Sequence, residues 1–275
     1  MTRVRRLAAV VVCSAWLVRG ECGAQSFDSG TEGWKVVTFC YRPGYVEPTA
    51  PIMLLPTCPG ECPQSQQCVV SVNCDTWAID PINPGGFLEA PDVDGTCMAG
   101  QVQYWSAPAA VLSQLGCSRG GSLIFSLQSV GAGGFFAQED VILDGGGTRL
   151  VCSVVSSAPA AWTPFSVPLA AGPWRLTGPG GPLASAEEVQ AALTQPDALY
   201  IRSEFRLGPD TARLDDAGVV APSPLGDLNQ DGLVNGADLG ILLAAWGSSD
   251  SVADLDCDGT VSGADLGVLL AGWTG

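Results

Sequence analysis

The chain has 275 residues, carries 28 acidic residues against 12 basic ones, and contains no histidine. Its formal net charge of -16 argues against binding to nucleic acid or to an anionic membrane, because both depend on basic patches, and it favours cations as partners. Without histidine, the chain can form neither a Ser-His-Asp or Cys-His nucleophile system nor a histidine-ligated catalytic zinc site.

The N-terminal segment 1–24 has the pattern of an export signal. Three arginines precede an apolar run over positions 7–18, and small residues surround Ala24. The run is shorter than the roughly 20 apolar residues that a spanning helix needs. We therefore predict a signal peptide over residues 1–24 and a secreted protein, extracellular or at the cell surface, without a membrane span. An uncleaved anchor is the alternative.

Cysteines are concentrated in the first part of the predicted mature chain. Eight of these cysteines form an even set. In an oxidising compartment this set predicts up to four disulfides, whose pairing the sequence leaves open. A zinc site in the cysteine-rich segment 56–74 is the alternative, although its spacing lacks paired zinc knuckles. Cys257, near the C-terminus, is either a free thiol or a cross-link to another chain. The even set consists of Cys40, Cys58, Cys62, Cys68, Cys74, Cys97, Cys117 and Cys152.

Residues 25–220 alternate short apolar runs with turns rich in Gly and Pro, a pattern typical of an all-β sandwich. One helix is predicted between the strands, where Ser185 is followed three positions later by Glu188 in the capping-box arrangement. A segment of this length is ample for one core between two sheets. The predicted strands lie within 120–130, 139–155, 162–169 and 198–207.

Some polar and aromatic side chains of this region have both a structural and a functional interpretation. Arg202, Glu204 and Arg206 alternate along one predicted strand, which indicates its solvent face. Asp215 and Asp216 are expected in an ordinary turn or strand end, with a structural ion as the alternative. Four aromatics could stack on sugars but are expected to pack in the core. They are Tyr104, Trp105, Trp162 and Trp174.

Several stretches of this region together resemble the laminin-type IV domain, also called the laminin B domain. They are FDSGTEGW (27–34), YWSAPAAVLSQLG (104–116), GGSLIFSLQSV with DVILDGGGTRLV (120–151), WTPFSVPL with WRL (162–176), and residues 184–219. The resemblance implies a jelly-roll-like β-sandwich and no catalysis. The cysteine-rich segment 56–74 departs from the family and is predicted to be a stapled surface loop.

Residues 221–225 are predicted to form a semi-rigid, proline-rich linker, and the acidic residues 226–275 follow it. This acidic part contains two near-copies of one sequence in tandem, with eight aspartates and no Lys or Arg. Calcium takes six to eight oxygen ligands, and a 12-residue loop can wrap it with oxygens at positions 1, 3, 5, 7, 9 and 12 and a glycine at position 6. Both copies meet this pattern, with Gly232 and Gly259 at the sixth position.

The sequence therefore predicts two calcium ions, held by loops 227–238 and 254–265. Metal-free turns rich in Asp are the alternative. Because the carboxylates of each loop would repel one another without metal, folding of residues 226–275 is predicted to require calcium. The predicted ligands are Asp227, Asn229, Asp231, the backbone of Leu233, Asn235 and Asp238 in the first loop, and Asp254, Asp256, Asp258, the backbone of Thr260, Ser262 and Asp265 in the second.

The last loop position holds aspartate where an ordinary EF-hand has glutamate. The two copies repeat after 27 residues, and no clear helix precedes either loop. By these three features, residues 226–275 resemble a type I dockerin domain. A short helix with an apolar stripe follows each loop, and the stripes are predicted to pack the two segments together. The stripes are Leu239, Leu242, Leu243 and Trp246, then Leu266, Leu269, Leu270 and Trp273.

The dockerin resemblance implies a cohesin-like protein partner. It places the partner contacts at the pair before the last ligand of each loop, which is Gly236-Ala237 and Gly263-Ala264 here. In the family this pair is often Ser-Thr, and the small apolar residues of this chain supply none of those hydrogen bonds.

Together these patterns predict a secreted, non-catalytic binding or adhesion protein. Its sandwich would hold a glycan or matrix component, and its calcium-binding dockerin would tether it in a cell-surface or polysaccharide-degrading assembly. A glycoside hydrolase acting on O-glycosyl bonds is the alternative, and needs two carboxylates beside the bond. A purely structural extracellular protein is a third possibility. The carboxylate pairs available to a hydrolase are Glu139 with Asp140, Glu187 with Glu188, and Glu204 with Asp215.

Overall fold

The computed structural model describes residues 27, 31–40, 54–55, 68–70, 78–79, 86–91, 101–116, 118, 120–221, 224–229, 231–250, 252–256 and 258–275. The predicted signal peptide, most of the cysteine-rich segment, part of the predicted linker and Cys257 lie outside these residues. Within the described part of the chain, no helix has both the length and the apolar character needed to cross a membrane.

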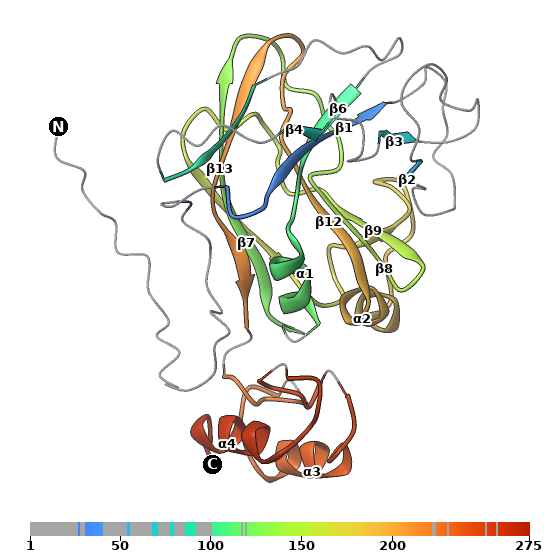
Figure 1. Ribbon diagram of the computed structural model, residues 1–275, viewed down its shortest axis with the longest axis vertical. Coiled ribbons are helices and arrows are strands. Elements are labelled where there is room, and N and C mark those ends of the chain that lie inside the picture. Colours follow the sequence, from blue (N-terminus) through green and yellow to red (C-terminus); the bar gives the residue numbers. More distant parts are fainter. Residues whose placement is uncertain are drawn as a thin grey trace, which may run out of the picture.

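Two β-sheets are the main elements of the described chain before the predicted linker (Figure 1). The larger sheet contains β1 (Lys35–Cys40), β2 (Leu54–Leu55), β3 (Cys68–Val70), β4 (Ala78–Ile79), β6 (Gln101–Ser106), β8 (Val141–Gly145), β9 (Thr148–Cys152), β11 (Arg175–Leu176) and β12 (Pro196–Arg202). The smaller sheet contains β5 (Leu88–Pro91), β7 (Ser122–Gly131), β10 (Thr163–Pro168) and β13 (Asp210–Val220). The helices are α1 (Ala109–Leu115), α2 (Ala186–Thr194), α3 (Gly236–Ala244) and α4 (Gly263–Ala271).

The strand order is β11-β9-β8-β12-β6-β1-β3-β2 in the larger sheet, with β4 paired to β1, and β10-β7-β13-β5 in the smaller one. The pairings between these described strands are antiparallel except that of β2 with β3. The prediction of a mainly β region is confirmed. Each predicted strand region contains a strand, and 139–155 forms the β8–β9 hairpin, which turns at Gly146 and Gly147 with positive φ.

Helix α2 begins at the predicted cap. Ser185 accepts a hydrogen bond from the Glu188 backbone N–H, and the Glu188 carboxylate accepts one from the Ser185 N–H, so the capping box is confirmed. Helix α1 was not predicted. It has seven residues and no side-chain cap, so the local sequence carries little helix signal.

The main core lies between the two sheets. Alternate residues of β7 (Leu123, Phe125 and Leu127) point into it and pack against inward residues of the larger sheet. A second cluster covers the opposite face of the larger sheet, since the neighbours Trp105 and Tyr104 belong to different clusters. Tyr104, Trp105 and Trp174 are fully buried, as expected, whereas Trp162 is 41% exposed.

The predicted solvent face of Arg202, Glu204 and Arg206 is wrong for the first two residues. Arg202 is fully buried, and its guanidinium lies over the rings of Phe135, Phe136 and Phe205, 4.5 to 5.4 Å from their centroids. The reason is tertiary: the segment before β8 covers this face of the sheet. The Glu204 carboxylate accepts a hydrogen bond from the backbone N–H of Gln103 and is also buried.

Asp140 is the ionic partner of Arg202, with its Oδ1 3.3 Å from the guanidinium. Its Oδ2 accepts hydrogen bonds from the backbone N–H groups of Val154 and Val155, both 2.7 Å long. Burial raises the pKa of Asp140 above its ordinary value, although these N–H groups and Arg202 act in the opposite direction. Asp140, immediately before β8, therefore links the end of β12 to the chain that leaves β9.

Cys152, at the end of β9, is a free thiol buried in the main core. Because Cys152 does not pair, the even set can form three disulfides at most, rather than the four that it would allow if all its members paired. The side chains of the other seven cysteines lie outside the described residues, and their pairing remains a prediction. Burial, followed by the nearby charge of Asp140, raises the pKa of the Cys152 thiol to about 12.

Cys152 is expected to resist alkylation by iodoacetamide at pH 8 in the native protein, because the thiolate is the reactive form and this thiol is both protonated and inaccessible. Peptide mass spectrometry should find it modified only after guanidinium unfolds the sandwich, and the unfolded sample serves as the control for peptide detection. Modification of native Cys152 as fast as that of free glutathione would contradict the buried placement.

Candidate metal centre

The backbone of loop 227–238 is folded by its own acidic side chains. The Asp227 carboxylate accepts hydrogen bonds from the N–H groups of Asp231 (3.1 Å) and Gly232 (2.8 Å). Asn229 Oδ1 accepts from Asp231 N–H, and Asp231 Oδ1 accepts from Leu233 N–H. Gly232 has φ 90°, the left-handed region that glycine tolerates, which lets the loop turn sharply at its sixth position.

Loop 254–265 repeats these contacts at the matching positions of the second copy. Asp254 accepts from the N–H groups of Asp258 (3.2 Å) and Gly259 (2.9 Å), and Gly259 has φ 91°. Asp256 Oδ1 accepts from Asp258 N–H, and Asp258 Oδ1 accepts from Thr260 N–H. The described residues of the two loops therefore repeat the same backbone hydrogen bonds at matching positions.

The last carboxylate of each loop closes it onto the following helix. Asp238 Oδ1 accepts from the N–H groups of Leu228 and Asn229, and its Oδ2 accepts from Asn235 N–H. The Asn235 side chain in turn accepts from the backbone N–H of Asp238, which completes a capping box at the start of α3, and it also accepts from Ala237 N–H. Burial acts to raise the pKa of Asp238, but the hydrogen bonds from these backbone N–H groups outweigh it, and the pKa lies below its ordinary value.

Asp265 makes the equivalent contacts in the second copy. Its Oδ1 accepts from Leu255 and Asp256 N–H, and its Oδ2 accepts from Ser262 N–H at the start of α4. Both closing aspartates are fully buried. This arrangement holds a carboxylate at the N-terminus of each helix, where the helix dipole favours negative charge.

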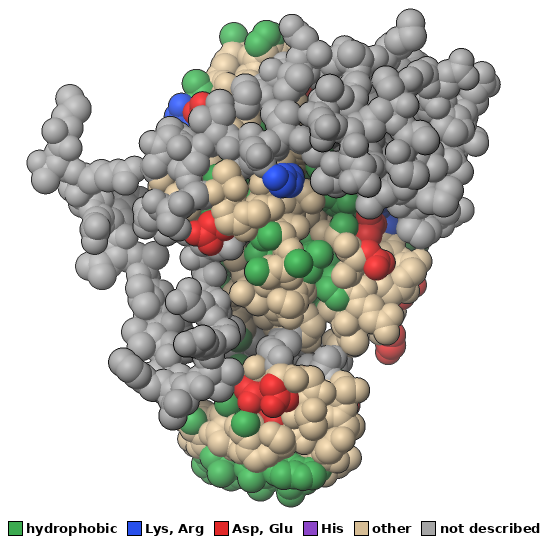
Figure 2. Space-filling view, viewed as in Figure 1, with side chains coloured by type: hydrophobic (Ala, Val, Ile, Leu, Met, Phe, Trp, Pro, Cys, Tyr) green, Lys and Arg blue, Asp and Glu red, His purple; other side chains and the backbone are tan. Residues whose placement is uncertain are grey.

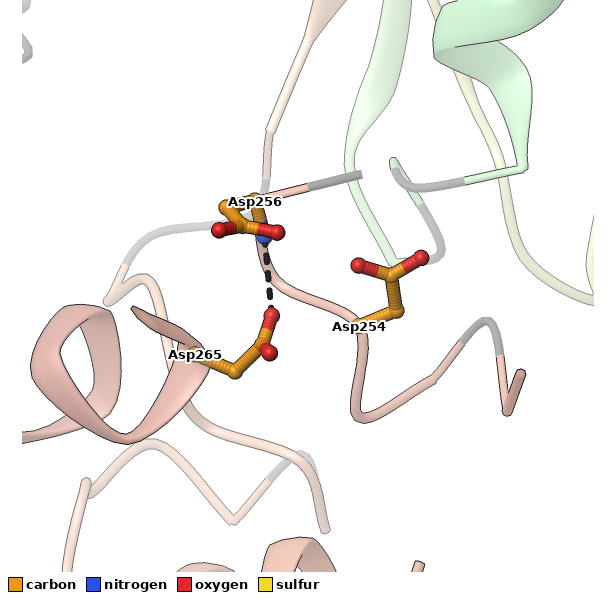
Figure 3. Close-up of side chains that lie close together, drawn as sticks. All are labelled: Asp254, Asp256 and Asp265. Atoms are coloured by element: carbon orange, nitrogen blue, oxygen red, sulfur yellow. Dashed lines mark hydrogen bonds between the residues drawn. The ribbon is translucent and has the colours of Figure 1, made fainter. Parts of the chain in front are cut away.

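Three predicted ligands of the second loop come together in space. Asp254, Asp256 and Asp265 each offer a carboxylate oxygen within 4.8 Å of the others (Figure 3). Burial raises the pKa of Asp256, and the charges of Asp265, Asp258 and Asp254 raise it further. The donor set consists of oxygen atoms, which fits a hard cation such as Ca²⁺ rather than a thiolate- or imidazole-seeking metal.

The first loop differs at its third position. Asn229 stands where the second loop has Asp256, and its amide donates to Asp231 Oδ2 over 2.9 Å. This amide avoids the repulsion that a fourth carboxylate would add to those of Asp227, Asp231 and Asp238. The second loop therefore has the greater density of negative charge.

A small core holds the two copies together. It consists of Val234, Leu242, Ala253, Val261 and Leu269. Backbone bonds close it twice: Val261 pairs with Gly247 and Ser248 after α3, and Val234 pairs with Thr274 after α4. Val234 and Val261 occupy the same position in the two copies, so the fold repeats with the sequence. These closures follow from the tertiary fold and have no local sequence signal.

The predicted packing of the apolar stripes is correct for only part of each stripe. Leu242 and Leu269 are buried, and Leu239 and Leu266 are partly buried against them. The remaining members are between 41% and 52% exposed; they are Leu243, Trp246, Leu270 and Trp273. The reason is size, since two nine-residue helices and their loops enclose only five buried apolar side chains.

Figure 2 shows hydrophobic side chains gathered along the base of this C-terminal part, below the two sheets. We call the four exposed stripe residues Leu243, Trp246, Leu270 and Trp273 the repeat face. Gly236-Ala237 and Gly263-Ala264, the pairs that the sequence assigned to partner contacts, lie exposed in the first turns of α3 and α4.

Four of the six carboxylates nominated for a glycoside hydrolase have structural contacts, whereas Glu139 Oε2 is buried without a hydrogen-bond partner. Asp140 is paired with Arg202, Glu188 completes the α2 capping box, and Glu204 accepts from Gln103 N–H. Asp215 accepts from the backbone N–H of Asp216 within β13.

Comparison with known proteins locates a family match in the sandwich. The model of the family Laminin B (Domain IV) matches residues 104–224. No curated protein matches the chain. Similar solved structures include the L4b domain of human laminin alpha-2, at 14% identity and TM-score 0.38, covering 44% of this chain and 71% of that one.

Two further structures are carbohydrate-binding domains. The N-terminal cellulose-binding domain of Cellulomonas fimi β-1,4-glucanase C has 12% identity and TM-score 0.36, covering 74% of this chain and 98% of that one. The family 11 carbohydrate-binding module of Clostridium thermocellum Lic26A-Cel5E has 14% identity and TM-score 0.28, covering 50% and 84%. The family-level result is that residues 104–224 match Laminin B (Domain IV).

Proposed function

We propose that this chain is a secreted, non-catalytic binding protein in which a calcium-folded C-terminal module tethers a ligand-binding sandwich to a protein partner. The folding of the two acidic loops carries the proposal, because the hydrogen bonds that the first aspartate of each loop accepts from the backbone recur at matching positions in both copies. The Laminin B (Domain IV) match supports a binding role rather than a catalytic one for the sandwich.

In this proposal the first calcium ion is held by Asp227, Asn229, Asp231, Leu233, Asn235 and Asp238, and the second by Asp254, Asp256, Asp258, Thr260, Ser262 and Asp265. Calcium supplies positive charge among carboxylates that otherwise repel one another. The chain prepares each site by fixing the carboxylates with backbone N–H groups, so little side-chain freedom is lost on binding.

The repeat face is the proposed contact surface for the partner. Trp buries a large apolar area and is enriched among the residues that anchor protein interfaces, and Leu adds apolar contact area beside it. The face carries one Leu and one Trp from each copy, so a partner can engage either copy in the same way. The small Gly-Ala pairs beside it leave room for close approach but give no side-chain hydrogen bonds. We therefore propose a cohesin-like partner whose contact surface is mainly apolar.

Surface plasmon resonance of the full chain against a panel of immobilised cohesin modules tests the tether. Binding is expected in calcium and is expected to disappear in EGTA. The double variant Trp246→Ala/Trp273→Ala should weaken binding by about tenfold or more, because each copy loses its aromatic anchor.

The matched control for this experiment is Leu207→Ala, which removes a 67% exposed apolar side chain from the sandwich and should bind like the parent chain. Absence of calcium-dependent binding to every module would overturn the tether, and full binding by the double Trp variant would overturn the repeat face as its contact surface.

A further inference from the structure

The outer face of the smaller sheet carries a connected row of polar side chains. Gln128 on β7, Arg213 on β13 and Glu89 on β5 lie directly opposite one another across three strands. Arg213 donates to Gln128 Oε1 over 3.1 Å and to Glu89 Oε2 over 2.9 Å. All three alternate with buried neighbours, so they point away from the core. The row is therefore held in place by its own contacts.

Two aromatic rings lie beside this row. Trp162 precedes β10 and Phe87 precedes β5, the two edge strands of the sheet, yet their rings meet edge to face with centroids 5.5 Å apart. The Arg213 guanidinium lies 5.3 Å from the Phe87 centroid. The loop that carries Trp162 is anchored to β7, since Pro159 and Ala160 accept hydrogen bonds from Ser129 and Gln128. The aromatic pair thus spans the face and is fixed from both sides.

A bulge in β13 adds carboxylates to the same sheet. Its register with β7 shifts between Asp215 and Gly218, and Asp216 has φ 51°, a left-handed conformation that is strained for a residue with a side chain. Asp216 is exposed and accepts a hydrogen bond from Ser126, on the strand that also carries Gln128. The expectation of a turn or strand end for Asp215 and Asp216 is therefore wrong, because both lie inside β13.

We propose that this face, formed by Trp162, Phe87, Gln128, Arg213, Glu89 and Asp216, binds a neutral polysaccharide chain. This assignment rests on the binding role proposed above for the sandwich. The exposed ring of Trp162 offers an apolar surface for the C–H face of a sugar, and the amide, guanidinium and carboxylate groups offer donors and acceptors to hydroxyl groups. Because the row is already ordered, binding costs little side-chain entropy.

Charge selects a neutral chain over an anionic one. Glu89, Asp215 and Asp216 contribute three carboxylates to this part of the sheet, against the single guanidinium of Arg213, and the whole chain carries -16. A sulfated or uronate-rich polymer would meet repulsion here. The charged side chains of this face also distinguish it from the core of a protein interface, which is depleted of charged residues.

Affinity gel electrophoresis of the full chain in calcium tests the proposal. The gels contain dextran, hydroxyethylcellulose, xyloglucan or galactomannan as neutral polymers, and dextran sulfate as the charged counterpart of dextran. At least one neutral polymer is expected to retard the parent chain, while dextran sulfate is not. Trp162→Ala should lower the association constant by about tenfold or more, and Trp162→Phe, which keeps a ring, by less.

The matched control is Leu183→Ala, which removes a 60% exposed apolar side chain elsewhere on the sandwich and should leave retardation unchanged. Unchanged thermal unfolding of Trp162→Ala would show that any loss is local. Retardation by no neutral polymer, or by dextran sulfate alone, overturns the proposal. Full retardation of Trp162→Ala also overturns it. In that case the sandwich would still bind the polysaccharide, but through another face. Calcium-dependent binding of the protein partner is measured separately by surface plasmon resonance. Loss of the tether and loss of this polysaccharide site are therefore distinguishable.

Discussion

Excess EGTA is expected to unfold residues 226–275 while the sandwich stays folded. Without metal, the carboxylates of Asp254, Asp256 and Asp265 are held within 4.8 Å of one another, and no Lys or Arg in this part of the sequence offsets them. The core beneath them has only five buried apolar side chains, too few to oppose that repulsion. Far-UV circular dichroism should show loss of the α3 and α4 signal, and calcium should restore it.

Two variants test whether this dependence of folding on calcium arises in the two acidic loops. Asp265→Ala removes a proposed ligand and the acceptor of three backbone N–H groups, so calorimetric titration should find about one calcium ion bound instead of two. Asp197→Asn, which alters an exposed aspartate in β12, is the matched control and should still bind both. Helicity and melting that are the same in EGTA as in calcium would refute the dependence on metal.

Arg202→Met is expected to destabilise the sandwich by ~3–5 kcal/mol. The change leaves Asp140 buried without its cation and leaves the carbonyls of Phe136 and Glu204 without their guanidinium donor. Urea denaturation of the parent and variant chains, monitored by near-UV circular dichroism in calcium, measures the difference.

Two comparison variants sharpen this measurement. Arg213→Met breaks a partly exposed ion pair with Glu89 and should cost only ~1 kcal/mol or less. The double variant Arg202→Met/Asp140→Asn should recover part of the loss, because the uncompensated charge is gone. A cost for Arg202→Met as small as that for Arg213→Met would show that the buried pair does not support the fold.

In these proposals the C-terminal part of the chain binds a protein through the repeat face. The sandwich binds a polysaccharide through the outer face of its smaller sheet. The first consists of apolar side chains that the C-terminal core is too small to enclose, and the second of an ordered polar row with one exposed tryptophan. The exposed apolar area of the repeat face suits a protein partner. The amide, guanidinium and carboxylate groups on the outer face of the smaller sheet suit the hydroxyl groups of a sugar.

Local features of this protein were predictable from the sequence by itself. The capping box of Ser185 and Glu188 and the left-handed glycines Gly232 and Gly259 lie where the pattern placed them. Each of the four predicted strand regions also contains a strand, although other strands, including β6 and β13, lie outside these regions. These features depend on interactions between residues a few positions apart, so a short stretch of sequence determines them.

Only the tertiary structure decided which side chains meet solvent. Arg202 alternates like a surface residue but is buried by the segment before β8, while Trp162 has the position of a core aromatic but lies 41% exposed beside an edge strand. Trp246 and Trp273 continue apolar stripes yet lie outside a core that is already filled. Burial depends on what packs over a residue from distant parts of the chain, and periodicity along one strand or helix contains no information about that cover.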